Sequence, residues 1–75
     1  MNFDDTRLEI GAGIREWRTR LHLTQKELAK AAKVHVNAVG RVERGEANPT
    51  LKLLWKIANK LKISVVQLLL GPARE

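Results

Sequence analysis

Asn37, Arg41 and Arg44 follow one another at intervals of four and three residues, so they share one face if residues 36–44 form a helix. In the major groove of DNA, an Asn amide can form two hydrogen bonds with adenine, and an Arg guanidinium can form two with guanine. The residue types and their spacing therefore predict a short helix that reads base edges. Polar residues on an exposed helix are more commonly just solvated, so the surrounding residues must support this interpretation.

The residues around this segment predict a pair of short helices packed on a common core. Four apolar side chains are expected to face inward, namely Leu28, Val34, Val39 and Val42. The small side chain of Ala29 lets the two helices cross closely. Five residues then face outward from the second helix: Val36, Asn37, Gly40, Arg41 and Arg44. On this face Val36 can touch a thymine methyl group, and Gly40 lets the backbone approach DNA.

Caps and apolar periodicity predict five helices, and no segment alternates convincingly as a strand does. The first helix follows Asp4, Asp5 or Thr6 and runs to about Leu21; the second opens at Thr24 and ends near Ala32; the third covers about residues 36–44; the fourth starts at Thr50 behind Pro49; the fifth opens at Ser64 and stops at Gly71 and Pro72. Two capping boxes support these starts, Thr24 with Glu27 and Ser64 with Gln67. Gly11 and Gly13 are expected to weaken the first helix, so that its first turns fray.

The apolar positions of these helices predict one core and one exposed patch. Core stripes are expected from Leu8, Ile10, Ile14, Trp17 and Leu21 in the first helix, from Leu51, Leu54, Ile57, Ala58 and Leu61 in the fourth, and from Val65, Leu68 and Leu69 in the fifth. Trp17 and Trp55 are expected in the core or an interface rather than as base-stacking aromatics. Val66 and Leu70 remain for a self-complementary patch, which predicts a homodimer through the fifth helix.

Composition sets the class of protein. Seventy-five residues suit a single domain, 1–75 with a core at 14–70, and the formal charge of +6 favours a nucleic-acid ligand. Residues 15–62 hold 12 of the 14 Lys and Arg residues.

No catalytic constellation is present, because the one serine, Ser64, serves as a cap. The chain contains no cysteine, and His22 and His35 have no companions at ligand spacing, so neither a metal nor another cofactor is expected. No signal peptide or membrane span is visible, which makes a cytoplasmic location the expectation.

From about Ile14 to Leu69 the sequence resembles the phage repressor and Cro type of helix-turn-helix domain, also called the XRE family. The segments that carry the resemblance are LTQKELA at 23–29, ERG at 43–45, Asn48 with Pro49, LLWKIANKL at 53–61 and ISVVQLL at 63–69. The resemblance implies an all-α fold, a compact five-helix bundle of the lambda-repressor-like DNA-binding type. Its helix-turn-helix would be the second and third helices.

The resemblance also implies roles for single residues. Base edges would be contacted at the positions of Val36, Asn37 and Arg41, with His35 beside them, and phosphates at Gln25, Arg44 and Asn48. Lys26 is as well explained by a phosphate contact as by solubility, and Glu43 would form a structural ion pair with Arg18. The family usually has Gly where this chain has Lys33 and Lys62, in turns that favour a positive φ, so either these lysines are strained or the turns differ.

The leading hypothesis is a sequence-specific double-stranded DNA-binding protein. It would act as a dimeric transcriptional regulator on a palindromic operator, as a repressor or as a controller of the restriction-modification or antitoxin type. The alternative is a protein-interaction module, such as an antitoxin or bridging coactivator, with weak DNA binding. A third possibility is a part that regulates an attached enzyme or ligand-binding domain. Salt-dependent DNA affinity distinguishes the first hypothesis from the second.

Overall fold

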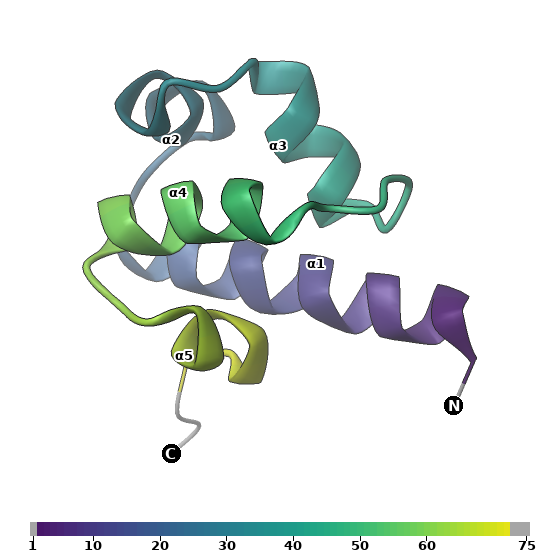
Figure 1. The fold of residues 1–75 in the computed structure, drawn as a ribbon. Coiled ribbons are helices and arrows are strands. Elements are labelled where there is room, and N and C mark those ends of the chain that lie inside the picture. Colours follow the sequence, from purple (N-terminus) through teal and green to yellow (C-terminus); the bar gives the residue numbers. More distant parts are fainter. Residues whose placement is uncertain (1, 73–75) are drawn as a thin grey trace.

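The structure is a computed structural model that describes residues 2–72, and in this part of the chain it consists of helices and loops without strands (Figure 1). The helices are α1 (Phe3–Arg20), α2 (Gln25–Ala32), α3 (Val36–Glu43), α4 (Leu51–Leu61) and α5 (Val65–Leu70). α1 packs against α3 and α5, while α2 packs against α3 and α4. The predicted five-helix, all-α architecture is confirmed.

Local capping sets where most helices begin, as the sequence predicts. The hydroxyls of Thr24 and Ser64 each accept a hydrogen bond from the backbone N–H three residues later, and both capping boxes are complete. Thr50 caps α4 in the same way. α1 begins earlier than expected, at Phe3, because the side chain of Asn2 accepts the N–H of Asp5 at 2.8 Å.

The core lies where the helices converge. Its fully buried large side chains are Ile14, Leu28, Val39, Val42, Ile57 and Leu68. The predicted inward orientation of the α2–α3 pair is therefore confirmed for Leu28, Val39 and Val42, and Val34 is partly buried against the same cluster. Burying side chains of this size contributes roughly 1.5–3 kcal/mol each, which makes this cluster the main constraint on the orientation of α3.

Four apolar residues expected in the core are exposed instead: Leu8, Leu21, Leu51 and Leu69. The N-terminal half of α1 projects past α4 and α5 (Figure 1). A regular apolar stripe along α1 is therefore covered by other helices over only part of its length. Trp55 is 57% exposed and stands outside the core, whereas Trp17 is partly buried against it. The indole Nε1 of Trp17 donates to the carbonyl of Gln67 at 2.9 Å, which ties α1 to α5.

Gly11 and Gly13 were expected to let the first turns of α1 fray; α1 runs continuously through both positions, and both glycines allow close helix contacts. A Cβ at Gly11 would lie 2.3 Å from the carbonyl oxygen of Val42, so the backbones of α1 and α3 approach closely there. A Cβ at Gly13 would lie 3.1 Å from the carbonyl oxygen of Leu68. Both glycines are buried within a continuous helix, and their positions let α3 and α5 pack on α1.

We expect Gly11→Ala to lower the free energy of unfolding by about 2 kcal/mol, because overlap with backbone outweighs the gain in helix propensity of up to about 1 kcal/mol. Urea denaturation of the purified variant measures this change. Gly13→Ala is the matched control and should lose less, since its neighbours lie farther away. A Gly11→Ala protein more stable than the wild type would contradict the close approach of α1 and α3.

The turns after α2 and α4 keep the left-handed backbone. Lys33 and Lys62, the C-caps of these helices, have φ of 58° and 61°. The turns therefore keep their usual geometry and the two lysines are strained, which costs roughly 1–2 kcal/mol for each lysine. His22, after α1, adopts the same conformation, which was not predicted from the sequence. Within residues 2–72, no helix combines the length and the apolar character that crossing a membrane requires.

Candidate nucleic-acid interface

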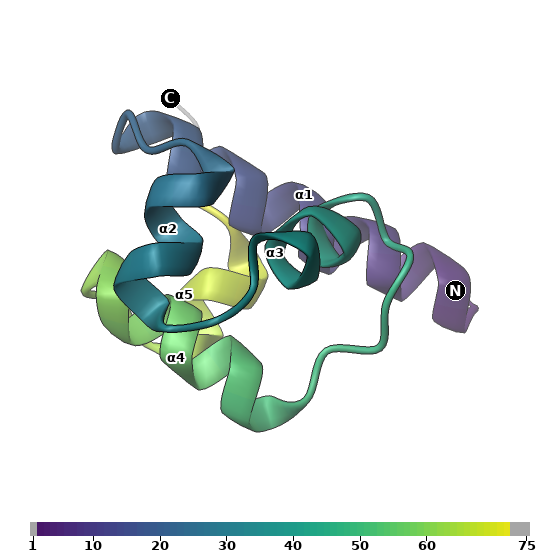
Figure 2. The same cartoon turned by 90° about the horizontal axis from the view of Figure 1, so that it is seen from above.

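The helix-turn-helix presents α3 at the edge of the molecule, above α1 and beside α2 (Figures 1 and 2). Val39 and Val42 anchor its inner face in the core, and the side chains of Val36, Asn37 and Arg41 are exposed on the outside. An isolated helix of eight residues would not be stable in water. Tertiary packing therefore holds α3 and sets the direction in which its outer face points.

The start of α3 is stabilised by a histidine. The ring nitrogen Nδ1 of His35 accepts the backbone N–H of Asn37 at 3.1 Å, so His35 is the N-cap of the helix. His35 is predicted from the sequence beside the base-contacting residues, but its role as a cap is not. No hydrogen bond of the Asn37 side chain is found among the described residues, and its amide faces solvent. A capped first turn thus carries an accessible amide on its outer side.

Both arginines at the end of α3 are engaged by Glu46 in the loop that follows. The carboxylate of Glu46 forms an ion pair with Nε of Arg44, and its backbone carbonyl accepts Nη2 of Arg41 at 3.2 Å. Because the Arg44–Glu46 pair is more than half exposed, it contributes at most about 1 kcal/mol to stability. A phosphate or a base edge can therefore replace Glu46 as the partner of either arginine at little cost.

Gly40 lies differently from the sequence expectation. It was predicted on the open outer face, but it is buried, because the side chains of Gln25 and Arg44 cover it. A Cβ at this position would lie 3.0 Å from Nη1 of Arg44 and 3.3 Å from Oε1 of Gln25. In the free protein, Gly40 thus makes room for these two side chains instead of presenting backbone to a ligand.

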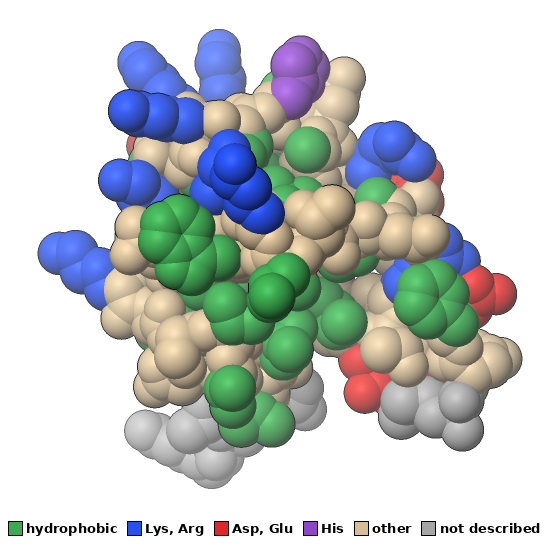
Figure 3. Space-filling view, viewed as in Figure 1, with side chains coloured by type: hydrophobic (Ala, Val, Ile, Leu, Met, Phe, Trp, Pro, Cys, Tyr) green, Lys and Arg blue, Asp and Glu red, His purple; other side chains and the backbone are tan. Residues whose placement is uncertain are grey.

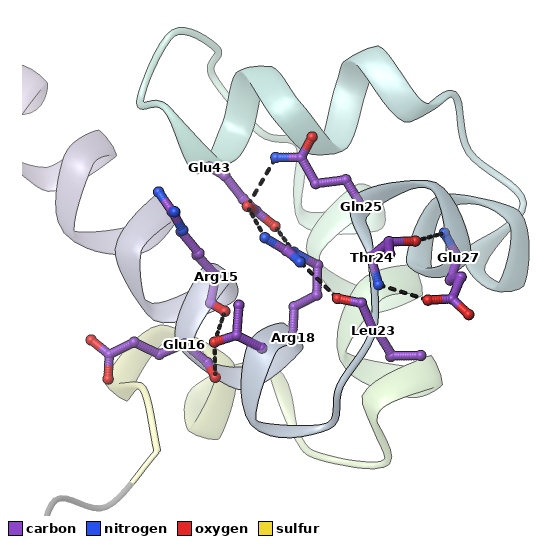
Figure 4. Close-up of polar contacts among 9 residues, drawn as sticks. Arg15, Glu16, Arg18, Leu23, Thr24, Gln25, Glu27 and Glu43 are labelled. Carbon is purple, nitrogen blue, oxygen red and sulfur yellow. Dashed lines mark hydrogen bonds and ion pairs between the residues drawn. The ribbon is translucent and has the colours of Figure 1, made fainter.

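An ion pair beneath α3 joins it to α1 and α2 (Figure 4). Arg18 and Glu43 contact one another through two hydrogen bonds of 2.6 and 3.0 Å, with side-chain exposures of only 11% and 2%. Arg18 also donates to the carbonyl of Leu23 at 2.7 Å. On its other side, Glu43 accepts Nε2 of Gln25 at 3.1 Å. The Glu43 carboxylate is therefore satisfied from two helices, and it fixes the first residue of α2 against the last residue of α3.

The N-terminus of α2 carries the predicted phosphate contacts Gln25 and Lys26. An amide nitrogen has two hydrogens, so Gln25 can donate one to Glu43 and still offer the other. The backbone N–H groups and the dipole at a helix N-terminus favour an anion there.

Hydrogen bonds from the backbone and side chain of Thr24 hold the pKa of Glu27 below its usual value. The stabilisation from this charged cap is therefore lost only as the pH falls through that lowered pKa.

Charge and apolar character separate over the surface. On the face shown in Figure 3, most Lys and Arg side chains project from the upper left, while apolar side chains gather lower, over α4 and α5. Other Lys and Arg side chains lie at the right, beside most of the acidic side chains of this face. Within residues 2–72, no three His, Asp or Glu side chains lie close enough together to hold a metal ion.

Sequence reasoning missed two residues at this interface. Glu46, which holds both arginines, lies within five residues of them, but its role depends on how the chain turns at Gly45 (φ 72°). Arg7 contacts Asn48 from 41 residues away, with Nη1 donating to Oδ1 at 3.2 Å. A contact over this separation leaves no local sequence signal, so only the tertiary structure could reveal it.

Two short helices with a shared buried face, the second showing an Asn and an Arg on its outer side, define a helix-turn-helix domain of the DNA-binding class. Residues 14–68 match the helix-turn-helix family HTH_3, and the chain belongs to this family. The match extends from the middle of α1 to the buried residue Leu68 of α5. It therefore includes the whole α2–α3 unit and its supporting core.

Several relatives are regulators. The HTH-type transcriptional regulator DicA of Escherichia coli is 41% identical over 64 residues, which cover 85% of this chain and 47% of DicA. The control protein C.SmaI of Serratia marcescens is 36% identical over 67 residues, which cover 89% of this chain and 80% of that protein. The crystal structure of the restriction-modification controller protein C.AhdI from Aeromonas hydrophila has a TM-score of 0.81 at 35% identity and covers 83% of this chain and 94% of its own.

The chain spans less than two-thirds of the length of three of its curated relatives. Their names nevertheless agree on one class, the HTH-type transcriptional regulators. Together with the family match, these likenesses show that the chain is a helix-turn-helix domain similar to domains found in transcriptional regulators and control proteins.

Proposed function

We propose that this protein binds double-stranded DNA sequence-specifically and regulates transcription as a homodimer, with α3 in the major groove. The observation that carries the proposal is the orientation of α3. Val39 and Val42 are buried, which leaves Asn37 and Arg41 exposed on the opposite side. Asn37 then pairs with adenine, Arg41 with guanine, and Val36 meets a thymine methyl group. His35 holds the first turn of α3 beside these bases.

Phosphate contacts position the reading helix. Gln25 and Lys26 at the start of α2 and Arg44 after α3 bind the DNA backbone near either end of the reading helix, and Asn48 extends this contact along the loop. Contacts of this kind fix register and orientation without choosing a sequence. The charge of +6 supports the proposal, because neutralising phosphates supplies most of the non-specific affinity.

The dimer is proposed to form through α5. Val66 and Leu70 are 65% and 80% exposed, and they lie one helical turn apart on the side of α5 that the core leaves open. An isologous contact through this patch would place two copies of α3 in successive major grooves, about 34 Å apart, on a palindromic operator.

We expect Val66→Gln/Leu70→Gln to shift the protein to monomers and to weaken operator binding, because the second half-site no longer contributes. Both changes keep the net charge, so the electrostatic attraction to DNA stays the same. Analytical ultracentrifugation measures the assembly, and Leu21→Gln, at an exposed apolar residue outside this patch, is the control. A wild type that is monomeric at high concentration, free and on DNA, would contradict the dimer.

Selection of binding sites from a random DNA pool tests the function as a whole. The expected product is a palindrome with two half-sites one helical turn apart. An enriched single half-site would support the reading helix and argue against the dimer. Failure to enrich any sequence, with only weak salt-dependent binding, would favour the second candidate, a protein-interaction module. The exposure of Trp55 and Leu51 is the observation in favour of that candidate.

A further inference from the structure

The N-terminal turns of α1 reach the loop that follows α3. Leu8 packs on Gly45 so closely that a Cβ at Gly45 would lie 2.7 Å from the Cδ2 atom of Leu8. Next to this contact, Nη1 of Arg7 donates to Oδ1 of Asn48 at 3.2 Å. These turns precede residue 14, where the family match begins. The loop that carries a proposed phosphate contact is therefore supported by a part of the chain outside that match.

The side chain of Arg7 is held from several directions. Its guanidinium lies over the ring of Phe3, 5.2 Å from the centroid, and it forms an ion pair with Asp4. Its Nε is buried without a hydrogen-bond partner among the described residues. A guanidinium restrained in this way already has the geometry that it needs to hold Asn48, so binding a ligand there requires less further ordering.

The contact with Arg7 sets the orientation of the Asn48 amide. The oxygen of the amide faces the guanidinium, because an NH₂ group turned toward Arg7 would set donor against donor. The amide nitrogen then points away from Arg7, and Asn48 is exposed to solvent. The N–H groups of the Asn48 amide therefore point outward, where they can donate hydrogen bonds to a phosphate oxygen. The amide oxygen could not do so in the same place, because it only accepts hydrogen bonds.

We infer that Arg7 is a positioning residue for DNA binding, which turns the amide of Asn48 toward a backbone phosphate, so that α1 supports the phosphate-binding surface of α2 and α3. The inference rests on the proposed function. Arg7 acts through Asn48, and Phe3 restrains Arg7. The partner is the phosphate backbone, so the contribution is the same for every DNA sequence.

A double-mutant cycle on DNA affinity tests this coupling. We expect Arg7→Gln and Asn48→Ala each to weaken binding to random and operator DNA about fivefold, as the loss of one hydrogen bond would. The double variant should bind about as well as Arg15→Gln/Asn48→Ala, because Arg7 has nothing left to orient and only the loss of one positive charge remains. Phe3→Leu leaves the charge unchanged and should give a smaller loss that also disappears in the Asn48→Ala background.

Arg15→Gln, on an exposed part of α1, is the control for the loss of one positive charge. It should weaken DNA binding less than Arg7→Gln does. In the double variant Arg15→Gln/Asn48→Ala, the fold-loss of affinity should be the product of the two single losses. Thermal denaturation of each variant checks that the fold is intact. If the effects of Arg7→Gln and Asn48→Ala multiply, or if Arg7→Gln equals Arg15→Gln, the inference is overturned while the proposed function stands. A folded wild type that binds no DNA would overturn both.

Discussion

The Arg41→Ala variant is expected to lose about 1–3 kcal/mol of binding free energy on the selected operator and far less on random DNA. Arg41 lies exposed on the outer face of α3, and within residues 2–72 its guanidinium has one weak partner, the carbonyl of Glu46 at 3.2 Å. Two hydrogen bonds to guanine would replace this contact. Fluorescence anisotropy with operator, point-changed operator and random duplexes measures the difference.

The pattern across sequences matters more than the size of the loss. At the base pair that Arg41 reads, the variant should accept other bases, whereas the rest of the operator keeps its preferences. Asn37→Ala should behave in the same way at a neighbouring adenine. Lys26→Ala is the matched control at a proposed phosphate contact, and it should weaken all duplexes similarly while reducing the salt slope by about one. Equal losses for Arg41→Ala on operator and random DNA would show that α3 presents a different face.

The largest stability effect is expected at the ion pair beneath α3. Glu43→Ala removes the partner of a largely buried guanidinium and also frees the amide of Gln25. Because an uncompensated charge in such a site is costly, the free energy of unfolding should fall by about 3 kcal/mol. For a domain of this size, that corresponds to a fall in Tm of roughly 12–24 °C. Differential scanning calorimetry measures both quantities.

Two comparisons separate burial of the charge from loss of the pair. Replacing both partners, in Arg18→Met/Glu43→Leu, should recover much of the stability, because no charge is left without a partner. Glu46→Ala breaks an exposed pair and should change stability by less than about 1 kcal/mol. If Glu43→Ala were as mild as Glu46→Ala, the pair would not hold α3 against α1.

Local interactions explain why so much of the fold could be predicted. The two capping boxes need only residues three apart, so Thr24 with Glu27 and Ser64 with Gln67 specify helix starts without any tertiary context. Apolar spacing within α3 likewise predicts that Val39 and Val42 face inward, and both are buried. The outer face of α3 follows from this orientation.

The predictions from the sequence failed where a residue's role depends on a neighbour that is distant along the chain. Gly11 lowers helix propensity by about 1 kcal/mol when considered alone, yet it permits the contact with the Val42 carbonyl. Gly40 belongs to the outer face by helical spacing, but the side chains of Gln25 and Arg44 cover it. Leu69 was expected in the core and is exposed, because Leu68 already fills the space that α5 faces.

Sequence alone determined the five helices, the starts of α2, α4 and α5 and the side of α3 that faces solvent, because these depend on spacing along the chain and on burial of apolar groups. Only the tertiary structure decided how Glu43 binds Arg18 and Gln25 together, how Glu46 holds two arginines, and how Arg7 orients Asn48. Each of these contacts depends on where the chain brings its side chains together in space. Periodicity shows which way a residue points, and packing determines what it meets there.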